Sequence, residues 1–598
     1  MAGFWGITVN NNIMKILLTT LNAKFVHTSL ALWYLFQFSR HDHPGLYFRE
    51  FNINQDLSWV CGEIFSERAD VVAFSCNIWN IGPTRILCQR LKALSPGTVI
   101  LLGGSEVSAD PRDIMEECPA VDFIIAGEGE LTFKEWLDEL SSGKGDWGSI
   151  DGLVFRKGSR IIQNRIREDI TDLGVIPFPY PEDLAPFRKK LVYYETTRGC
   201  PFSCQYCLSA NERGVRYFPL ERVKAELLTF MRADIAQVKF VDRSFNCNPS
   251  WAKEIWNFLL EARRQYPCET NFHFEIVGDL LDAESLEILA KAPLGFFQFE
   301  IGVQSTNPET LSLIERRMNF PRLGQNVRRL RETTNVFVHL DLIAGLPGED
   351  CRSFAKTFND NLLLKPNRLQ LGFLKLLHGS GLRKKAAEYG YLYAGEPPYE
   401  VMASRWISYE ELLKLKVMED LLERYYNSER FRLSFDYLIP QFSTPFQLFE
   451  DFAAWWKKRG LDETSHKVKD LYEYLLQFYI STGLDGRALQ NLLKCDLLSS
   501  ERMVELPAWA GRSNPDLHPK GYKFWQKQNH RQQYIPEWND LAVRDIQRRV
   551  IFEEFDCNPQ EVAASPLENP QWNPLIFLFI YRGSEVSVYP ITREEFEE

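Results

Sequence analysis

Three cysteines stand close together near the middle of the chain, in the segment Thr197-Arg-Gly-Cys200-Pro-Phe-Ser-Cys204-Gln-Tyr-Cys207, while the other cysteines are scattered singly. Spacings of three and two residues on one loop let three thiolates converge on one face of a metal cluster. A [4Fe–4S] cluster normally takes four cysteines, so three leave one iron open to chelate a ligand that carries an amine and a carboxylate. A zinc site usually needs a fourth Cys or His at short spacing, and none stands nearby. Zinc, or three unlinked thiols, are the alternatives to this cluster.

Polar and glycine-rich segments follow several apolar runs downstream of these cysteines. They contain Asp242 in VKFVDRSFN, Glu300, Gln304 and Ser305 in FEIGVQS, and the stretch Asp341–Glu349 (DLIAGLPGE). Each segment alone is typical of an ordinary turn. Their order behind the cysteines predicts loops that surround one ligand.

A second set of candidate residues lies in the first quarter of the chain, where glycines and polar residues follow short apolar runs. Glycines at strand ends let backbone amides approach a large flat ligand closely. By itself the pattern also suits a nucleotide, or an ordinary turn of an α/β domain. The candidate contacts are Ser75, Asn77, Gly103, Gly104, Glu106, Gly127, Glu128 and Gly129.

The elements that position these residues alternate between strand-like and helix-like runs. Four buried strands, Met14–Leu21, Asp70–Cys76, Thr98–Gly104 and Val121–Gly127, are separated by helical spacing. This alternation predicts a doubly wound, Rossmann-like α/β domain, which binds ligands beyond the carboxyl ends of its strands.

Six further strand-like runs between Leu191 and Leu382 predict a partial TIM-like (β/α)6 barrel, with its site on the loops at the strand carboxyl ends. Beyond Ala403 the periodicity becomes helical, and a β-hairpin around Arg582-Gly583 ends the pattern. We therefore expect an α/β domain at 14–150, a hairpin and linker at 151–189, a barrel at 190–385 and a mainly helical domain at 386–598.

Composition restricts the class of protein. The 598 residues are 45% hydrophobic and 25% charged, as in ordinary soluble chains, and require several domains. A net charge of -11 argues against nonspecific nucleic-acid binding. No apolar run reaches the roughly 18 residues of a membrane span, and Met1–Ile13 lacks the features of a signal peptide. The expected location is the cytoplasm.

The pattern Cys-x3-Cys-x2-Cys, with Tyr206 before the last cysteine, resembles the signature of the radical S-adenosylmethionine (SAM) superfamily. The resemblance implies a [4Fe–4S] cluster on the three cysteines, which reductively cleaves SAM to a 5′-deoxyadenosyl radical. It also implies an external one-electron donor of the flavodoxin or ferredoxin type. By the same resemblance, the residues around SAM are Tyr206, Asp242, Glu300, Gln304 and Ser305.

The runs VILLGGSEVSADP and VDFIIAGEGELTF resemble the B12-binding domain that precedes many radical SAM barrels. The whole arrangement is similar to a B12-radical SAM subfamily with a carboxy-terminal domain of the DUF4080 type. This sequence lacks one motif of other B12 proteins, the Asp-x-His-x-x-Gly sequence whose histidine ligates cobalt. The resemblance therefore implies cobalamin but leaves its lower axial ligand undefined.

The function expected from these cofactors is methylation of an unreactive carbon in an unknown small-molecule or peptide substrate. One alternative is a B12-radical SAM enzyme that rearranges or cyclises its substrate, and another is a sensor that only binds B12 or SAM. A tRNA methylthiotransferase is disfavoured by the acidic charge and by the lack of a second cysteine set.

Overall fold

The computed structural model describes residues 13–212, 214–583 and 585–597. Residues 1–12, which hold nearly all of the segment tested above as a signal peptide, lie outside the described residues. The chain divides into two compact units. The first comprises the chain up to residue 354 together with 364–366 and 371–409, and the second comprises 355–363, 367–370 and the chain from 410 onward.

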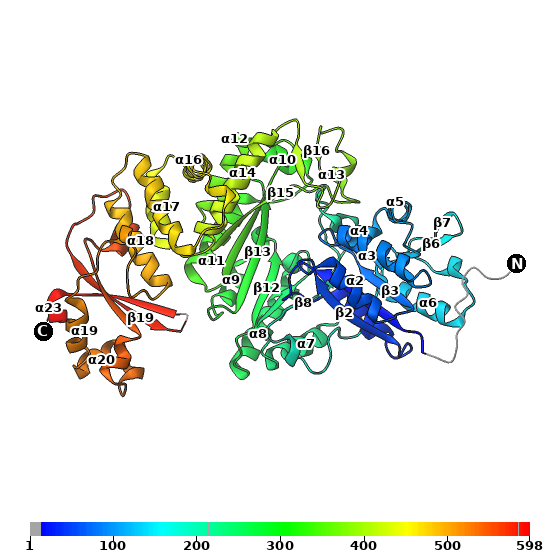
Figure 1. The fold of residues 1–598 in the computed structure, drawn as a ribbon, viewed down its shortest axis with the longest axis horizontal. Coiled ribbons are helices and arrows are strands. Elements are labelled where there is room, and N and C mark those ends of the chain that lie inside the picture. Colours follow the sequence, from blue (N-terminus) through cyan, green and yellow to red (C-terminus); the bar gives the residue numbers. More distant parts are fainter. Residues whose placement is uncertain (1–12, 213, 584, 598) are drawn as a thin grey trace. The chain divides into compact units, whose positions relative to one another are not determined.

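The amino-terminal part of the first unit is built on a seven-stranded sheet (Figure 1). Its order is β2-β1-β3-β4-β5-β6-β7, in which the first five strands are parallel and the last two antiparallel. The strands are β1 (Ile16–Asn22), β2 (Leu46–Asn52), β3 (Val71–Ser75), β4 (Val99–Gly103), β5 (Phe123–Ile125), β6 (Leu153–Lys157) and β7 (Arg160–Gln163). The doubly wound domain is thereby confirmed, with β2 as a strand that the sequence pattern did not indicate.

Helices cover both faces of this sheet, because its strands are apolar at successive positions and successive side chains point to opposite faces. Leu17 packs in the core beneath α2 (Leu57–Ser66), α3 (Ile81–Leu94) and α5 (Pro111–Glu117). Leu18, the next residue, packs in the opposite core beneath α1 (Leu30–Ser39) and α6 (Gly129–Ser142). A short helix, α4 (Ser105–Ser108), follows β4 directly.

A six-stranded sheet forms the partial barrel, in the order β15-β14-β13-β12-β11-β8, and lies in the first unit except for residues 368–370 of β15. The strands are β8 (Leu191–Tyr194), β11 (Gln237–Phe240), β12 (Asn271–Ile276), β13 (Phe297–Gln304), β14 (Phe337–Ala344) and β15 (Arg368–Phe373). Burial alternates along β13: Phe299 and Ile301 are fully buried, whereas Glu300 and Gly302 face the barrel interior. The predicted open barrel is confirmed.

The helices of the barrel follow its strands in the chain. They are α7 (Leu220–Arg232), α8 (Pro249–Gln265), α9 (Ala283–Leu289), α10 (Pro308–Leu313), α11 (Phe320–Thr333) and α12 (Cys351–Leu362). Two small hairpins complete this part: β9 (Thr197–Arg198) with β10 (Arg216–Tyr217), and β16 (Leu392–Tyr393) with β17 (Val401–Ala403). The short helix α13 (Gly381–Lys384) lies between the two hairpins in the sequence.

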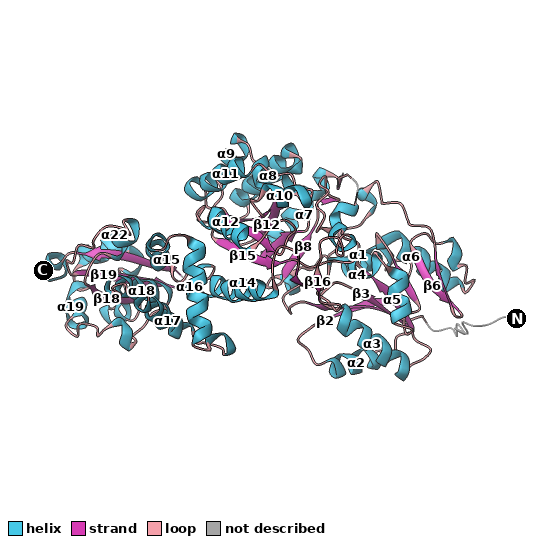
Figure 2. Ribbon diagram, turned by 90° about the horizontal axis from the view of Figure 1, so that it is seen from above, coloured by secondary structure: helices cyan, strands magenta, loops and turns pink. Residues whose placement is uncertain are grey.

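The second unit is mainly helical and contains one antiparallel sheet of β18 (Val550–Phe555), β19 (Leu575–Arg582) and β20 (Glu585–Ile591) (Figure 2). The predicted hairpin is thus confirmed as β19 and β20, while β18 was not predicted. The helices are α14 (Tyr409–Leu421), α15 (Arg432–Leu438), α16 (Pro445–Lys458), α17 (Val468–Ser481), α18 (Arg487–Ser500), α19 (Leu517–Phe524), α20 (Gln528–Tyr534), α21 (Val543–Gln547), α22 (Pro559–Ala564) and α23 (Arg593–Glu597). Within the described part of the chain, no helix is both long and apolar enough to cross a membrane.

Candidate active site

The three clustered cysteines lie on the loop that follows β8, and the course of this loop depends on a glycine. Gly199 has φ +93°, and a Cβ atom there would lie 2.2 Å from the Gly214 carbonyl oxygen. Only glycine tolerates both the backbone conformation and this close approach. The β9–β10 hairpin, which pairs Arg198 with Arg216, flanks this turn. The backbone conformation immediately before Cys200 is therefore fixed.

Asp242 anchors the start of the same loop. Its buried carboxylate accepts hydrogen bonds from the Thr196 backbone N–H (3.0 Å), the Thr196 hydroxyl (2.6 Å) and the Thr197 hydroxyl (2.6 Å). Burial raises the pKa of Asp242, an effect that these three donors oppose. Asp242 therefore holds the start of the cysteine loop, and Asp242 does not line the cavity described next.

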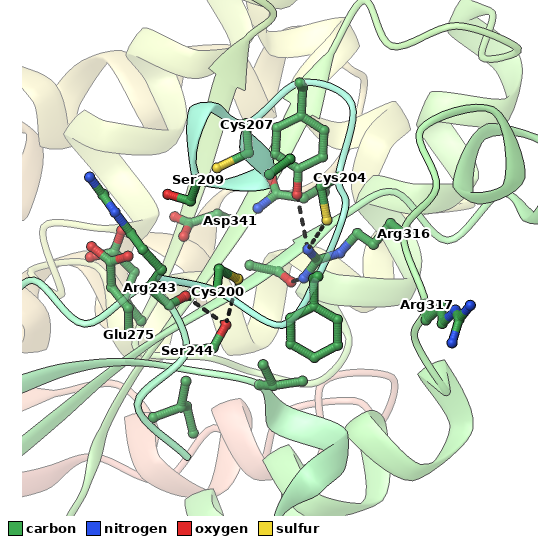
Figure 3. Close-up of a pocket in the computed structure, with 18 residues that line it drawn as sticks. Cys200, Cys204, Cys207, Ser209, Arg243, Ser244, Glu275, Arg316, Arg317 and Asp341 are labelled. Carbon is green, nitrogen blue, oxygen red and sulfur yellow. Dashed lines mark hydrogen bonds between the residues drawn. The ribbon is translucent and has the colours of Figure 1, made fainter. Parts of the chain in front are cut away.

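A cavity of about 220 Å³ opens at the carboxyl ends of the barrel strands and is surrounded by the three cysteines (Figure 3). Cys204 is buried, while Cys200 and Cys207 are partly exposed. Figure 3 shows Glu275 and Arg243 on one side of the cavity and Arg316 and Arg317 on the other. The cavity is lined by Cys200, Phe202, Cys204, Tyr206, Cys207, Ser209, Ala210, Arg243, Ser244, Glu275, Ile276, Val277, Glu300, Gly302, Gln304, Arg316, Arg317 and Asp341.

The arrangement of the thiols bears on the choice between zinc and a cluster. In the described residues, no group of three His, Cys, Asp or Glu side chains is placed to hold a single metal ion. Cysteines that hold a [4Fe–4S] cluster each bind a different iron, so they need to surround a space rather than meet at one atom. Cys200, Cys204 and Cys207 all line one cavity without meeting at one point, and this donor set suits a cluster.

Arg316 fixes the inner edge of the cysteine loop. Its guanidinium donates to the Tyr206 hydroxyl (2.9 Å) and to the Gly302 carbonyl oxygen, and lies 3.7 Å from the Cys204 sulfur. On the other side, the Ser244 hydroxyl lies 3.7 Å from the Cys200 sulfur. The Arg316 contact places a charged donor beside the Cys204 sulfur, where it would stabilise the negative charge of a thiolate cluster.

Carboxylates from three neighbouring strands form the floor of the cavity. Glu300 contacts Lys239 (2.9 Å) and His273 (3.0 Å). Burial alone would raise the pKa of Glu300, but the hydrogen bond from His273 and the charge of Lys239 lower it well below its ordinary value. Burial and the neighbouring Glu300 raise the pKa of Glu275 to about 7. Asp341, whose pKa is also raised by burial, contacts His339 at 3.0 Å.

Gln304 supplies a group that lacks a partner in the protein. It has φ +71° at an irregularity of the β13–β14 pairing, and its buried Oε1 atom has no hydrogen-bond partner among the described residues. A Cβ atom on Gly302 would lie 2.4 Å from the side-chain amide nitrogen of Gln304, so a larger residue there would displace the Gln304 side chain. A buried carbonyl oxygen of this kind calls for a donor from a ligand. Ser305, in contrast, is fully buried, donates to Glu349 (2.6 Å) and does not line the cavity.

A second cavity, of about 120 Å³, lies at the carboxyl ends of β1, β3, β4 and β5 against α1 and α6. Its walls are mainly apolar and its rim is formed by glycines. Gly104 has φ +109°, and a Cβ atom there would lie 2.4 Å from the Cys76 carbonyl oxygen. The lining residues are Leu18, Ala31, Leu32, Leu35, Ala73, Phe74, Ser75, Leu101, Gly103, Gly104, Ile125, Gly127, Gly129 and Glu130. Five of the residues predicted to contact cobalamin, Ser75, Gly103, Gly104, Gly127 and Gly129, are thus brought together here.

The structure does not bring the other three predicted contacts to this cavity. The Asn77 side chain accepts from Ser105 (3.3 Å). Glu106 is buried and accepts from the Tyr399 hydroxyl (2.6 Å). Glu128 is ion-paired with Arg216 (2.8 Å). These side chains hold neighbouring loops in place instead.

Several cavity residues were not predicted from the sequence. Glu275 could have been found, because it is the charged residue of a strand run, NFHFEIV, in which polar residues alternate with apolar ones, and it lines the barrel cavity. Arg243, Ser244 and Arg316 carry no such signal, since they lie on loops whose course depends on distant contacts.

The fold and the site together define a class of protein: an α/β domain with a glycine-rimmed apolar cavity, followed by an open barrel whose first loop carries three cysteines around a polar cavity. Three family models match the chain. They are the B12 binding domain (residues 16–137), the radical SAM superfamily (194–360) and a protein family of unknown function, DUF4080 (387–577). The chain therefore contains a B12-binding region, a radical SAM region and a DUF4080 region, in that order, which is the arrangement that the sequence resemblance implied.

Two curated relatives are each 30% identical to this chain. One is 2-(S-pantetheinyl)-carbapenam-3-carboxylate methyltransferase of Streptantibioticus cattleyicolor, over 311 residues that cover 48% of this chain and 44% of the relative. The other is the cobalamin-dependent radical SAM methyltransferase TokK of Streptomyces tokunonensis, over 304 residues that cover 48% of this chain and 44% of the relative. The match thus spans less than half of either relative.

The solved structure of the cobalamin-dependent S-adenosylmethionine radical enzyme OxsB, with aqua-cobalamin and S-adenosylmethionine bound, has a similar fold. The TM-score is 0.53 at 13% sequence identity, and the match covers 81% of this chain and 79% of OxsB.

The cofactors of this family, a [4Fe–4S] cluster, SAM and cobalamin, fit the two cavities described above. The three cysteines and the unpartnered Gln304 carbonyl suit the cluster and SAM, and the glycine-rimmed apolar cavity suits a flat part of cobalamin.

Proposed function

We propose that this protein is a cobalamin-dependent radical SAM methyltransferase that acts on an unreactive carbon of a small-molecule or peptide substrate. The observation that carries this proposal is the cavity in which Cys200, Cys204 and Cys207 face the carboxylates of the barrel floor. The glycine-rimmed cavity in the same compact unit supports a second cofactor. The printed names of both curated relatives, which are methyltransferases, support methyl transfer as the reaction.

Each group of residues has a task in this proposal. The three cysteines hold the cluster, and the Gln304 carbonyl with the Glu300 carboxylate orients the polar groups of SAM. Phe202, beside the cysteines, helps exclude water from the cavity. When bound, the cluster supplies the electron that cleaves one SAM, and cobalamin carries the methyl group of another.

The test is product analysis under anaerobic conditions. The protein is reconstituted with iron, sulfide and cobalamin, SAM and a strong reductant are added, and the nucleosides are quantified by mass spectrometry. We expect 5′-deoxyadenosine and S-adenosylhomocysteine, both absent when the three cysteines are replaced by alanine. 5′-Deoxyadenosine without S-adenosylhomocysteine would favour a rearranging or cyclising enzyme instead. Neither product from a protein with an intact cluster would favour a protein that only binds its cofactors.

We further propose that the electron comes from an external one-electron donor of the flavodoxin or ferredoxin type and that the protein works in the cytoplasm. All 12 cysteines are free thiols, which suits a reducing compartment. Replacing the chemical reductant with a reduced flavodoxin in the same assay tests the donor, and loss of all 5′-deoxyadenosine would contradict it.

A further inference from the structure

Arg198 lies two residues before Cys200 in the chain, yet its side chain reaches into the amino-terminal α/β domain. Its guanidinium is 2.6 Å from Glu130 Oε1 and 3.3 Å from Glu128 Oε1, and it lies over the ring of Tyr34 at 5.5 Å. A third carboxylate, from Glu195, is 2.8 Å away. One arginine of the cysteine loop is thus held by three carboxylates, two of which belong to the other domain.

Glu130 links this contact to the second cavity, because Glu130 also lines the glycine-rimmed cavity. It lies in the first turn of α6, and its side chain is only 6% exposed. Glu130 therefore lines the cavity that suits cobalamin, and its carboxylate binds the arginine that precedes the first cluster cysteine. Among the described residues that line this cavity, Glu130 is the only one with a charged side chain.

The Arg198 side chain is held by its surroundings, since carboxylates from Glu130, Glu195 and Glu128 lie 2.6, 2.8 and 3.3 Å from its guanidinium. A planar guanidinium binds several carboxylates at once in a directional way that an ammonium group does not reproduce. A shift of the Glu130 carboxylate is consequently transmitted to the backbone that leads to Cys200.

We propose that Arg198 is a positioning residue that couples the two cofactor sites, so that filling the cobalamin cavity changes the affinity of the cysteine loop for its cluster, and the reverse. This inference rests on one part of the proposed function, namely that the protein binds both a cluster and cobalamin. Reciprocity is required, because a coupling free energy acts equally in both directions.

The experiment measures the coupling directly. Hydroxocobalamin is titrated into the full-length protein with and without a reconstituted cluster, and the dissociation constant is followed by corrin absorbance. We expect the two constants of the natural protein to differ by about fivefold or more. In Arg198→Met the ratio should fall to about one, and Arg198→Lys, which keeps the charge but not the planar fork, should recover only part of it.

Arg216→Met is the matched control. Arg216 also joins the barrel side to the α/β domain, but its partner Glu128 does not line the cavity. Although Glu128 also lies 3.3 Å from Arg198, this variant leaves the Arg198–Glu130 contact in place and should keep the ratio of the natural protein. If Arg198→Met does not fold, Glu130→Gln removes the same charge pair from the other side and should also bring the ratio to about one. Thermal melts establish which variants are folded.

A spectroscopic signature completes the test. Adding hydroxocobalamin should change the Mössbauer spectrum of the oxidised cluster in the natural protein and in Arg216→Met, but not in Arg198→Met. A natural ratio of one, or equal losses in Arg198→Met and Arg216→Met, would overturn the proposal. Neither titration needs substrate or turnover, so a failure of the methyltransferase proposal would appear only in the product analysis.

Discussion

Replacing Gly127 with valine tests the glycine-rimmed cavity in a way that separates ligand binding from folding. Gly127 lines the cavity and has φ +90°, and a Cβ atom there would meet no atom within 4 Å. A Cβ atom there therefore has room, and the expected cost to folding is the backbone strain, about 1–3 kcal/mol. It does, however, occupy part of a cavity of only about 120 Å³. We expect the cobalamin dissociation constant to rise at least about tenfold, which corresponds to about 1.4 kcal/mol.

Gly143→Val is the matched control. Gly143 ends α6 in the same domain, has φ +69°, and also offers open space to a Cβ atom, but it does not line the cavity. Both variants should lose a similar amount of stability in urea denaturation, while only Gly127→Val should lose corrin absorbance after gel filtration. Unchanged cobalamin retention in Gly127→Val, or equal losses in both variants, would show that this cavity is not the cobalamin site.

Three further predictions concern individual carboxylates. In Asp242→Asn, the new side-chain NH2 group is a donor placed against the donors of Thr196, so the variant should lose about 2 kcal/mol of stability and bind less iron after reconstitution. An unchanged iron content would contradict the role of Asp242 as the anchor of the cysteine loop. Because the pKa of Glu275 is raised to about 7 in the folded protein, its contribution to stability is complete below about pH 4.5 and is lost as pH rises through 7. With 29% of its side chain exposed, the loss should be about 2 kcal/mol between pH 5 and 8 in urea denaturation, and Glu275→Gln should abolish it; an equal loss in that variant would refute the assignment. Asp496→Ala, in the second unit, should cost about 3 kcal/mol because it strands the buried Ser434 donors, and a cost below about 1 kcal/mol would contradict this.

The strands of both sheets could be predicted where their burial leaves a continuous or alternating apolar run. β1 and β4 are buried along nearly their whole length, and β13 alternates, so each has a pattern that survives in the sequence. β2 (LYFREFN) and β18 (VIFEEF) interrupt that pattern with charged residues on partly exposed faces. Their strand character comes from pairing with β1 and β19, which no local pattern encodes.

The residues of the candidate site likewise divide into those with a local sequence pattern and those whose roles depend on distant contacts. The cysteine spacing and the glycines at strand ends are local features, and the structure places them around two cavities. The roles of Asp242, Glu106 and Glu128 could not be predicted, because each is decided by a partner far away in the chain. A carboxylate at a strand end looks the same in the sequence whether it meets a ligand, a threonine hydroxyl or an arginine.

The most direct test of the account is the cofactor content of the anaerobically reconstituted protein. Iron, acid-labile sulfide and cobalamin are quantified in the natural chain and in the Cys200→Ala, Cys204→Ala, Cys207→Ala triple variant. We predict about four irons and four sulfides with one cobalamin in the natural chain, and cobalamin alone in the variant. A triple variant that keeps its iron and sulfide, or a natural chain that retains no cobalamin, would contradict the account.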